Sequence, residues 1–121
     1  MNTKAEVTLE WADGEYLFAL KGAQIEELEE KCGNVGVGLI YQRVKLGSYR
    51  YVDLYHTIRL GLIGGGMGAV EAKRLVDRYA PGTVPIESGP NSPFSVASAI
   101  LGVVFHGMEK LPPGKAEAAK E

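Results

Sequence analysis

The stretch that decides the fold is GLIGGGMG, at residues 61–68. Its three consecutive glycines, Gly64, Gly65 and Gly66, disfavour a helix interior because each glycine costs about 1 kcal/mol relative to alanine. They suit a helix end, where the backbone can adopt a positive φ without a Cβ penalty. Helical periodicity flanks the run at 51–63 and 68–79. We therefore predict a turn between two helices, with at least one of the three glycines at positive φ.

A glycine-rich segment can also be a phosphate-binding loop. A Walker loop ends in Gly-Lys-Ser/Thr, and Met67-Gly68 stands in that place here. A dinucleotide-binding fingerprint follows a buried strand, whereas the segment before this glycine run has helical periodicity. We therefore expect no phosphate and no cofactor at the glycine run.

Two strands are expected near the N-terminus. Residues 6–11 alternate polar and apolar side chains, which is typical of a half-buried strand. Residues 15–20 read as the returning strand after a tight turn at 12–14, in which Gly14 can adopt a positive φ. A two-stranded hairpin is marginally stable alone, so its apolar face must pack on something else. That face contains Val7, Leu9 and Trp11, with partners among Tyr16, Phe18 and Leu20.

Periodic apolar residues predict four or five short helices after the hairpin. Ser92 can cap the last of them, and Pro93 suits the first helical position. The predicted fold class is α+β, an N-terminal hairpin packed on these helices. We expect a single domain at 1–110 and a disordered tail at 111–121. The expected helices cover 24–32, 37–46, 51–63, 68–79 and 93–105.

Composition excludes several classes of protein. The formal net charge of −2 gives no sign of the basic patch that nucleic-acid binding requires. The single cysteine, Cys32, excludes an internal disulfide and a multi-cysteine zinc site. No stretch reaches the roughly 18 apolar residues of a membrane-spanning helix. Neither nucleic acid nor a membrane is therefore an expected partner.

No constellation of residues makes a convincing active site. His56 and His106 lie on separate predicted helices, without a further ligand at metal-binding spacing. Cys32 shares a helix face with Ile25 and Leu28, so we interpret it as a small buried hydrophobe. We therefore expect no enzyme, no metal and no cofactor. The acidic run at 26–30 and the basic residues Lys73, Arg74 and Arg78 read as solvated helix faces, although the basic ones could contact an acidic partner.

The segment 94–105 contains no charged residue. A helix that is apolar on every side is buried or meets a partner. We expect one side of this helix to face the internal core. Its other side, or an open edge of the hairpin, would then meet a second copy or another protein. The predicted interaction surface consists of Leu101, Val103, Val104 and Phe105.

Three segments carry a resemblance to a known family. They are GAQIEELE at 22–29, IRLGLIGGGM at 58–67, and Glu71-Ala72 followed by LVDRY at 75–79. The chain resembles the small tail proteins of gene transfer agents and related phages and prophages, which are labelled tail assembly chaperones or tail tube-type proteins. One departure is Gly68, where family members often carry Ser or Thr as a helix cap; glycine serves there at a small cost.

The resemblance implies a non-enzymatic role in building a tail. A tail assembly chaperone would bind the tape-measure protein and recruit tube subunits in the cytoplasm of the bacterial host. The alternative is a structural tube-type component of the virion tail. We favour the chaperone here, since a stacked ring subunit usually needs an extensive sheet and only one hairpin is evident. Implied partners are the tape-measure protein, a tube subunit or a second copy of the chain.

Overall fold

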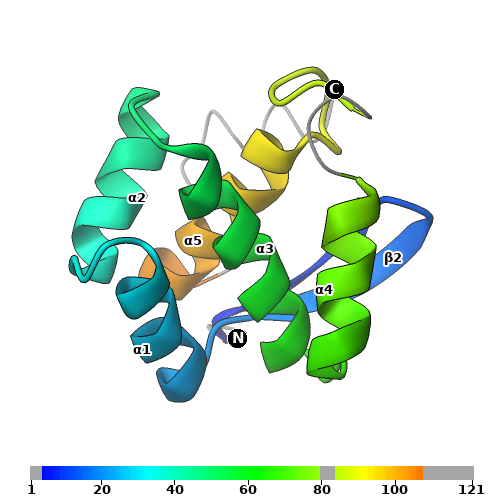
Figure 1. The fold of residues 1–121 in the computed structure, drawn as a ribbon, viewed down its shortest axis with the longest axis horizontal. Helices are drawn as coiled ribbons and strands as arrows, with labels where there is room; N and C mark the ends of the chain where they lie inside the picture. The colour runs from blue at the N-terminus through cyan, green and yellow to red at the C-terminus, as the bar shows by residue number, and fades with distance from the viewer. Residues whose placement is uncertain (1–3, 80–83, 108–121) are drawn as a thin grey trace.

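The computed structural model describes residues 4–79 and 84–107 of the 121-residue chain. Within these residues an antiparallel two-stranded hairpin precedes five helices, which confirms the predicted α+β class (Figure 1). The predicted disordered tail at 111–121 lies outside the described residues. The elements are β1 (Glu6–Trp11), β2 (Gly14–Ala19), α1 (Gly22–Lys31), α2 (Val37–Leu46), α3 (Tyr51–Gly64), α4 (Ala69–Arg78) and α5 (Pro93–His106).

The hairpin packs through one face, as predicted. Val7 lies opposite Phe18 in the register, and both side chains are buried together with that of Trp11. The turn differs from our prediction, because Ala12 rather than Gly14 has the positive φ, of 58°. Gly14 already pairs with Trp11 in the ladder, so the two-residue turn consists of Ala12 and Asp13 and the left-handed conformation falls there.

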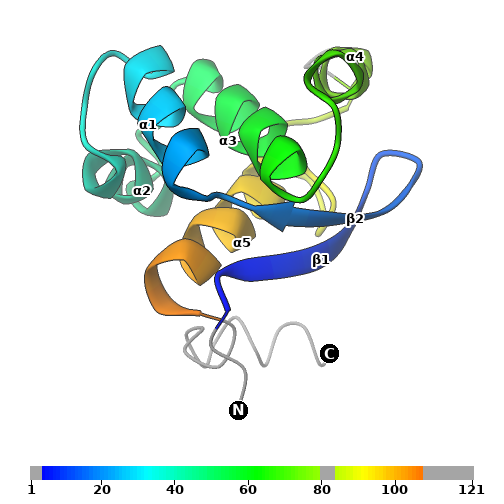
Figure 2. The ribbon, with the colours of Figure 1, turned by 90° about the horizontal axis from the view of Figure 1, so that it is seen from below.

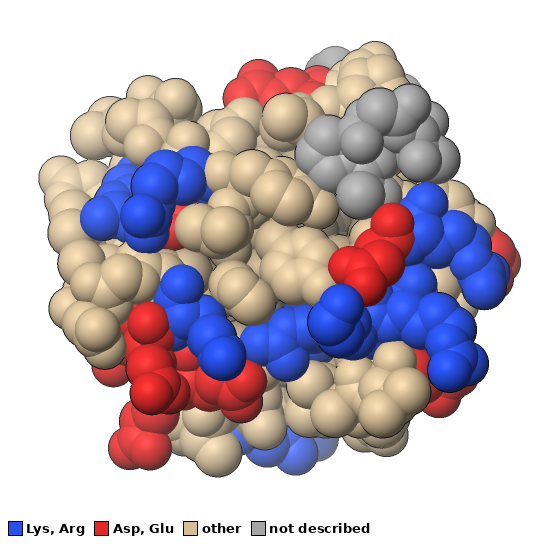
Figure 3. All heavy atoms as spheres, in the orientation of Figure 1, with Lys and Arg blue, Asp and Glu red and all other residues tan. Residues whose placement is uncertain are grey.

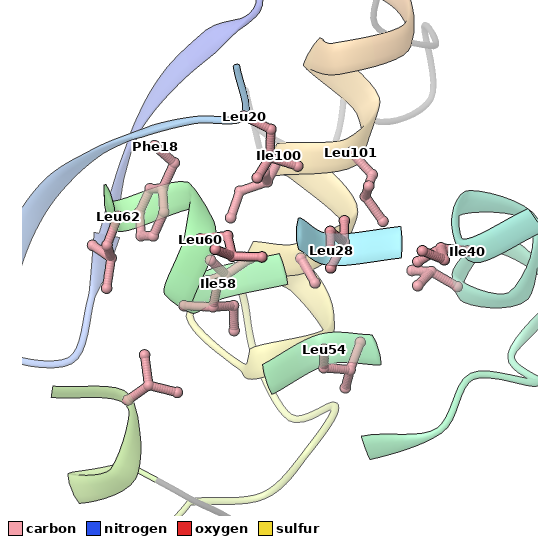
Figure 4. Close-up of a cluster of buried hydrophobic side chains, with 14 of the residues drawn as sticks. Phe18, Leu20, Leu28, Ile40, Leu54, Ile58, Leu60, Leu62, Ile100 and Leu101 are labelled. Carbon is pink, nitrogen blue, oxygen red and sulfur yellow. The ribbon is translucent and has the colours of Figure 1, made fainter. Parts of the chain in front are cut away.

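Helix α3 is the centre of the structure. It contacts β2, α1, α4 and α5, and Figure 2 shows it between α1 and α4 above the hairpin. Its side chains Leu54, Ile58, Leu60 and Leu62 are almost completely buried. They meet Phe18 from the hairpin and residues of α1 and α5 in one apolar cluster (Figure 4). The predicted helix at 51–63 is therefore the element around which the others pack.

Local chemistry sets the predicted helix ends. Helix α2 ends at Gly47 with a φ of 76°, a conformation that costs glycine little. Helix α5 begins at Pro93, and the Ser92 hydroxyl oxygen accepts a hydrogen bond from the Ser95 N–H at 3.3 Å. Within the described residues, none of the helices has both the length and the apolar character needed to cross a membrane.

Candidate interaction surface

The glycine run closes α3 with a Schellman motif. The Gly66 N–H donates to the Ile63 carbonyl at 3.0 Å, and the Met67 N–H donates to the Leu62 carbonyl at 3.0 Å. These two bonds define that motif, whose residue after the C-cap takes a left-handed conformation. Gly66 has a φ of 115°, whereas Gly65 has a φ of −82°. The turn contains Gly65 and Gly66, with Gly66 at positive φ as predicted, whereas Gly64 is the last residue of α3.

The other two glycines of the run serve close packing. A Cβ atom on Gly64 would lie 1.9 Å from the Ala19 carbonyl oxygen, and one on Gly65 would lie 2.0 Å from that of Leu17. The C-terminal end of α3 therefore lies directly against the backbone of β2. Sequence reasoning missed this contact. The number of glycines was the sequence signal for it. A helix end needs only one glycine at positive φ, so a run of three indicates a further constraint such as close packing.

The same geometry bears on the phosphate-loop alternative. The N–H groups of Gly65, Gly66 and Met67 all donate to carbonyls of α3. Phosphate loops need backbone N–H groups that point at the anion. These three groups are already engaged, so the turn does not offer such a cradle, and the absence of phosphate binding stays a prediction.

Helix α5 departs from our prediction. Leu101 and Val103 were expected to face a partner, but both are completely buried, so this part of the predicted interaction surface is wrong. The reason is that α5 is enclosed on several sides, by β1, β2, α2 and α3. Val104 is half-buried, and Phe105 is 43% exposed while it stacks on Tyr41 at 4.6 Å between ring centroids. Of the four residues of the predicted interaction surface, only Val104 and Phe105 reach the surface.

Cys32 has the buried position that we predicted. Its side chain is completely buried, and its Sγ atom lies 3.9 Å from the Val52 carbonyl oxygen. Burial, followed by the nearby Asp53 carboxylate, raises the pKa of the thiol to about 12. A nucleophilic cysteine needs the opposite shift, so neither the burial nor the pKa of Cys32 favours a nucleophile.

The structure does not bring the two histidines together in one site. His56 lies on α3, and its Nδ1 atom accepts a hydrogen bond from Arg59 Nε at 3.3 Å. Burial, followed by the charge of Arg59, lowers the pKa of His56. His106 is in the last turn of α5, with its ring 5.8 Å from that of Tyr41. Among the described residues, no group of three or more His, Cys, Asp or Glu side chains could hold a metal ion.

Asp53 is a buried charge that sequence reasoning missed. Its carboxylate is completely buried at the start of α3, where it accepts from the Arg50 N–H at 2.9 Å and lies 3.4 Å from an Arg43 nitrogen. Arg50 also donates to the Cys32 carbonyl oxygen at 2.6 Å. This network ties α1, α2 and α3 together. The sequence signal for this site was an Asp three residues after a helix N-cap, a position from which the side chain accepts the N-cap N–H.

Two shallow hollows lie beside α1. One, of about 370 Å³, lies over α3 between α1 and α4. The basic residues that line this hollow include Lys31, Arg59 and Lys73. The Arg59 guanidinium pairs with the Glu27 carboxylate at 3.2 Å between nitrogen and oxygen. The other, of about 480 Å³, adjoins the C-terminal half of α1. Its lining includes three carboxylates and consists of Glu26, Glu29, Glu30, Asn34, Val35 and Gly36.

Charged side chains are segregated on the face that these helices form. In Figure 3, acidic side chains gather over α1 at the lower left, and basic ones extend from the middle of the face over α4 on the right. Oppositely charged regions of this kind favour the encounter and orientation of a complementary protein surface. These charged regions, together with Val104 and Phe105 at the end of α5, make a protein-binding surface the best-defined candidate site.

Comparison with known proteins identifies the class. The fold carries a charged surface suited to protein contacts, and a family model described as "Phage tail tube protein, GTA-gp10" matches residues 4–107. The chain belongs to this family of phage tail proteins, which confirms the resemblance seen in the sequence. Searches of curated proteins and of solved structures found no match. The family description names a tube protein, so it favours the structural alternative over the chaperone that we preferred from sequence.

Proposed function

We propose that this protein is a non-enzymatic, tube-type structural component of the tail of a phage or gene transfer agent. The observation that carries the proposal is the family match, which extends over every described residue. The protein would act by contacts with other tail proteins and with further copies of itself, and it would reside in the virion tail.

The chemistry of the described residues supports a role without catalysis. The one thiol has its pKa raised to about 12 by burial, and the two histidines lie on α3 and α5 without a shared partner. Enzyme sites usually gather titratable groups with tuned pKa values in a cleft. The polar clusters present here join helices to one another, as Asp53 does with Arg43 and Arg50.

A second candidate is the tail assembly chaperone. One observation favours it: the described part of the chain has a sheet of two strands beside five helices, a small sheet for a stacked ring subunit. In this role the protein would bind the tape-measure protein in the host cell and would leave before the particle is complete.

Purified particles separate the two candidates. Particles from induced or infected cells are banded on a density gradient, and each fraction is probed for this chain and for the capsid protein. A tube component sediments with the particles and stays with them on a second gradient at low salt. A chaperone stays in the light fractions together with its client, which would contradict the structural proposal.

A further inference from the structure

Helix α1 presents two carboxylates that no described residue engages. Glu26 and Glu30 are exposed, and no ion pair or hydrogen bond engages either one in the described part of the chain. Their neighbours are already in use: Glu27 pairs with Arg59 at 3.2 Å, and Glu29 accepts the Val37 N–H at 2.8 Å. Glu26 and Glu30 are four residues apart, so they project from the same face of α1.

Helix α4 presents the matching cations. Arg74 and Arg78 are exposed and four residues apart, and no described residue forms an ion pair or hydrogen bond with them. Lys73, by contrast, pairs with Asp77 at 2.8 Å. One turn before Arg74, the Val70 side chain is 72% exposed. Within the described part of the chain, the outer face of α4 thus combines two unpaired guanidinium groups with an exposed apolar side chain.

The two helices lie on opposite sides of α3 and run in the same direction. Figure 1 shows both α1 and α4 running from the bottom of the view to the top. A rotation about an axis roughly along these helices would therefore bring α1 of one copy against α4 of the next without reversing either helix.

We propose that α1 of one copy docks on α4 of a second copy, head to tail. Four residues of helix span about 6 Å, so the two carboxylates and the two guanidinium groups have the same spacing. In the parallel arrangement Glu26 meets Arg74 and Glu30 meets Arg78. Arginine binds carboxylates through two parallel hydrogen bonds. The acidic hollow beside α1, of about 480 Å³, leaves room for the long arginine side chains.

An apolar contact lies close to the same register. Ala23 is exposed three residues before Glu26 and Val70 is exposed four residues before Arg74, an offset of about 1.5 Å along the helices. In the parallel arrangement the small Ala23 side chain covers Val70. The partner is a second copy because one chain carries both halves of the match, with equal spacing and direction.

A head-to-tail contact between two copies leaves an unused α4 face on one copy and an unused α1 face on the other. Such heterologous contacts close into rings or continue as filaments. The inference rests on the proposed function, since it names the contact by which a tube-type protein would meet its neighbours.

Charge reversal tests the contact in the full-length purified protein. The variants are Glu26→Lys with Glu30→Lys, Arg74→Glu with Arg78→Glu, and the chain that carries all four changes. Sedimentation velocity at low and high salt reports the assembly state. The wild type is expected to form species larger than a dimer at low salt and to lose them at high salt. Each double variant is expected to lose them, and the fourfold variant to regain them. The control is Glu10→Lys, which changes an exposed carboxylate on β1 and leaves assembly unchanged.

Several results would overturn the proposal. They are a wild type that stays monomeric at low salt and high concentration, a dimer as its largest species, and double variants that assemble like the wild type. A folded fourfold variant that stays monomeric would also overturn the proposal. Circular dichroism checks folding, and the neutral pairs Glu26→Gln with Glu30→Gln and Arg74→Gln with Arg78→Gln replace any reversal that unfolds the chain. Assembly through these faces by a protein absent from particles would contradict the tube role while leaving the contact intact.

Discussion

Gly64 of α3 lies against Ala19 of β2 so closely that a Cβ atom on Gly64 would be 1.9 Å from the Ala19 carbonyl oxygen. Gly65 has the same relationship to Leu17, at 2.0 Å. Real Cβ atoms do not approach backbone oxygens this closely, so α3 would have to move away from β2 to accept a side chain at either position.

Gly64→Ala is therefore expected to destabilise the fold by about 1–3 kcal/mol, the usual cost of overpacking. Urea unfolding followed by circular dichroism measures the change. Gly38→Ala is the matched control, since a Cβ there would have no neighbour within 4 Å and Gly38 lies inside α2. The control is expected to gain up to about 1 kcal/mol from helix propensity. Equal effects of both changes would show that Gly64 is not a packing position.

Because α5 is largely buried, we expect substitutions at two of its residues to cost different amounts of stability. Leu101→Ala should cost about 2–5 kcal/mol because it empties a fully enclosed site, and Leu101 has no exposed surface. Phe105→Ala should cost clearly less, since Phe105 is 43% exposed and loses mainly its stacking on Tyr41. Thermal and urea unfolding of the two variants provide the comparison. A mild Leu101→Ala effect would mean that Leu101 is not in the core.

We expect the folded protein to lose stability on mild acidification because of His56. Burial and then Arg59 hold its pKa below the usual 6.5, so the folded protein favours the neutral imidazole. A lowered folded-state pKa gives stability that is present above the unfolded value and is lost as pH falls through the folded value. Stability should thus decline from pH 7 toward pH 5.5. His56→Gln should flatten this slope, whereas His106→Gln, at the exposed end of α5, should retain it. An unchanged slope in His56→Gln would refute the assignment.

The Cys32 thiol should resist modification while the protein is folded. Its pKa of about 12 and its complete burial leave almost no accessible thiolate at pH 8. Iodoacetamide labelling followed by mass spectrometry should show an unmodified native protein and full labelling in 8 M urea. Rapid labelling without denaturant would show that Cys32 is accessible in the folded state.

The parts of the fold that local chemistry determines could be predicted from the sequence. The sequence Ser92-Pro93 marks the start of α5, and Gly47 marks the end of α2, because caps and positive φ values depend on a few adjacent residues. The alternation at 6–11 likewise identifies β1. These features need no knowledge of what packs against them.

The missed features depend on contacts between distant segments. Nothing near Gly64 and Gly65 in the sequence indicates that β2 lies against them. An apolar helix such as α5 lacks the periodicity that separates inner from outer sides, so Leu101 and Val103 could not be distinguished from Phe105. The burial of Asp53 likewise follows from Arg43, ten residues earlier on α2.

If the chain is a structural part of the tail, its copy number in purified particles must be high. Gradient-purified particles are digested with isotope-labelled standard peptides for this chain and for the capsid protein, and quantitative mass spectrometry gives copies per particle. We expect many copies per particle, retained through a second gradient at low salt. Fewer than one copy per particle, with the chain abundant in the lysate, would contradict it.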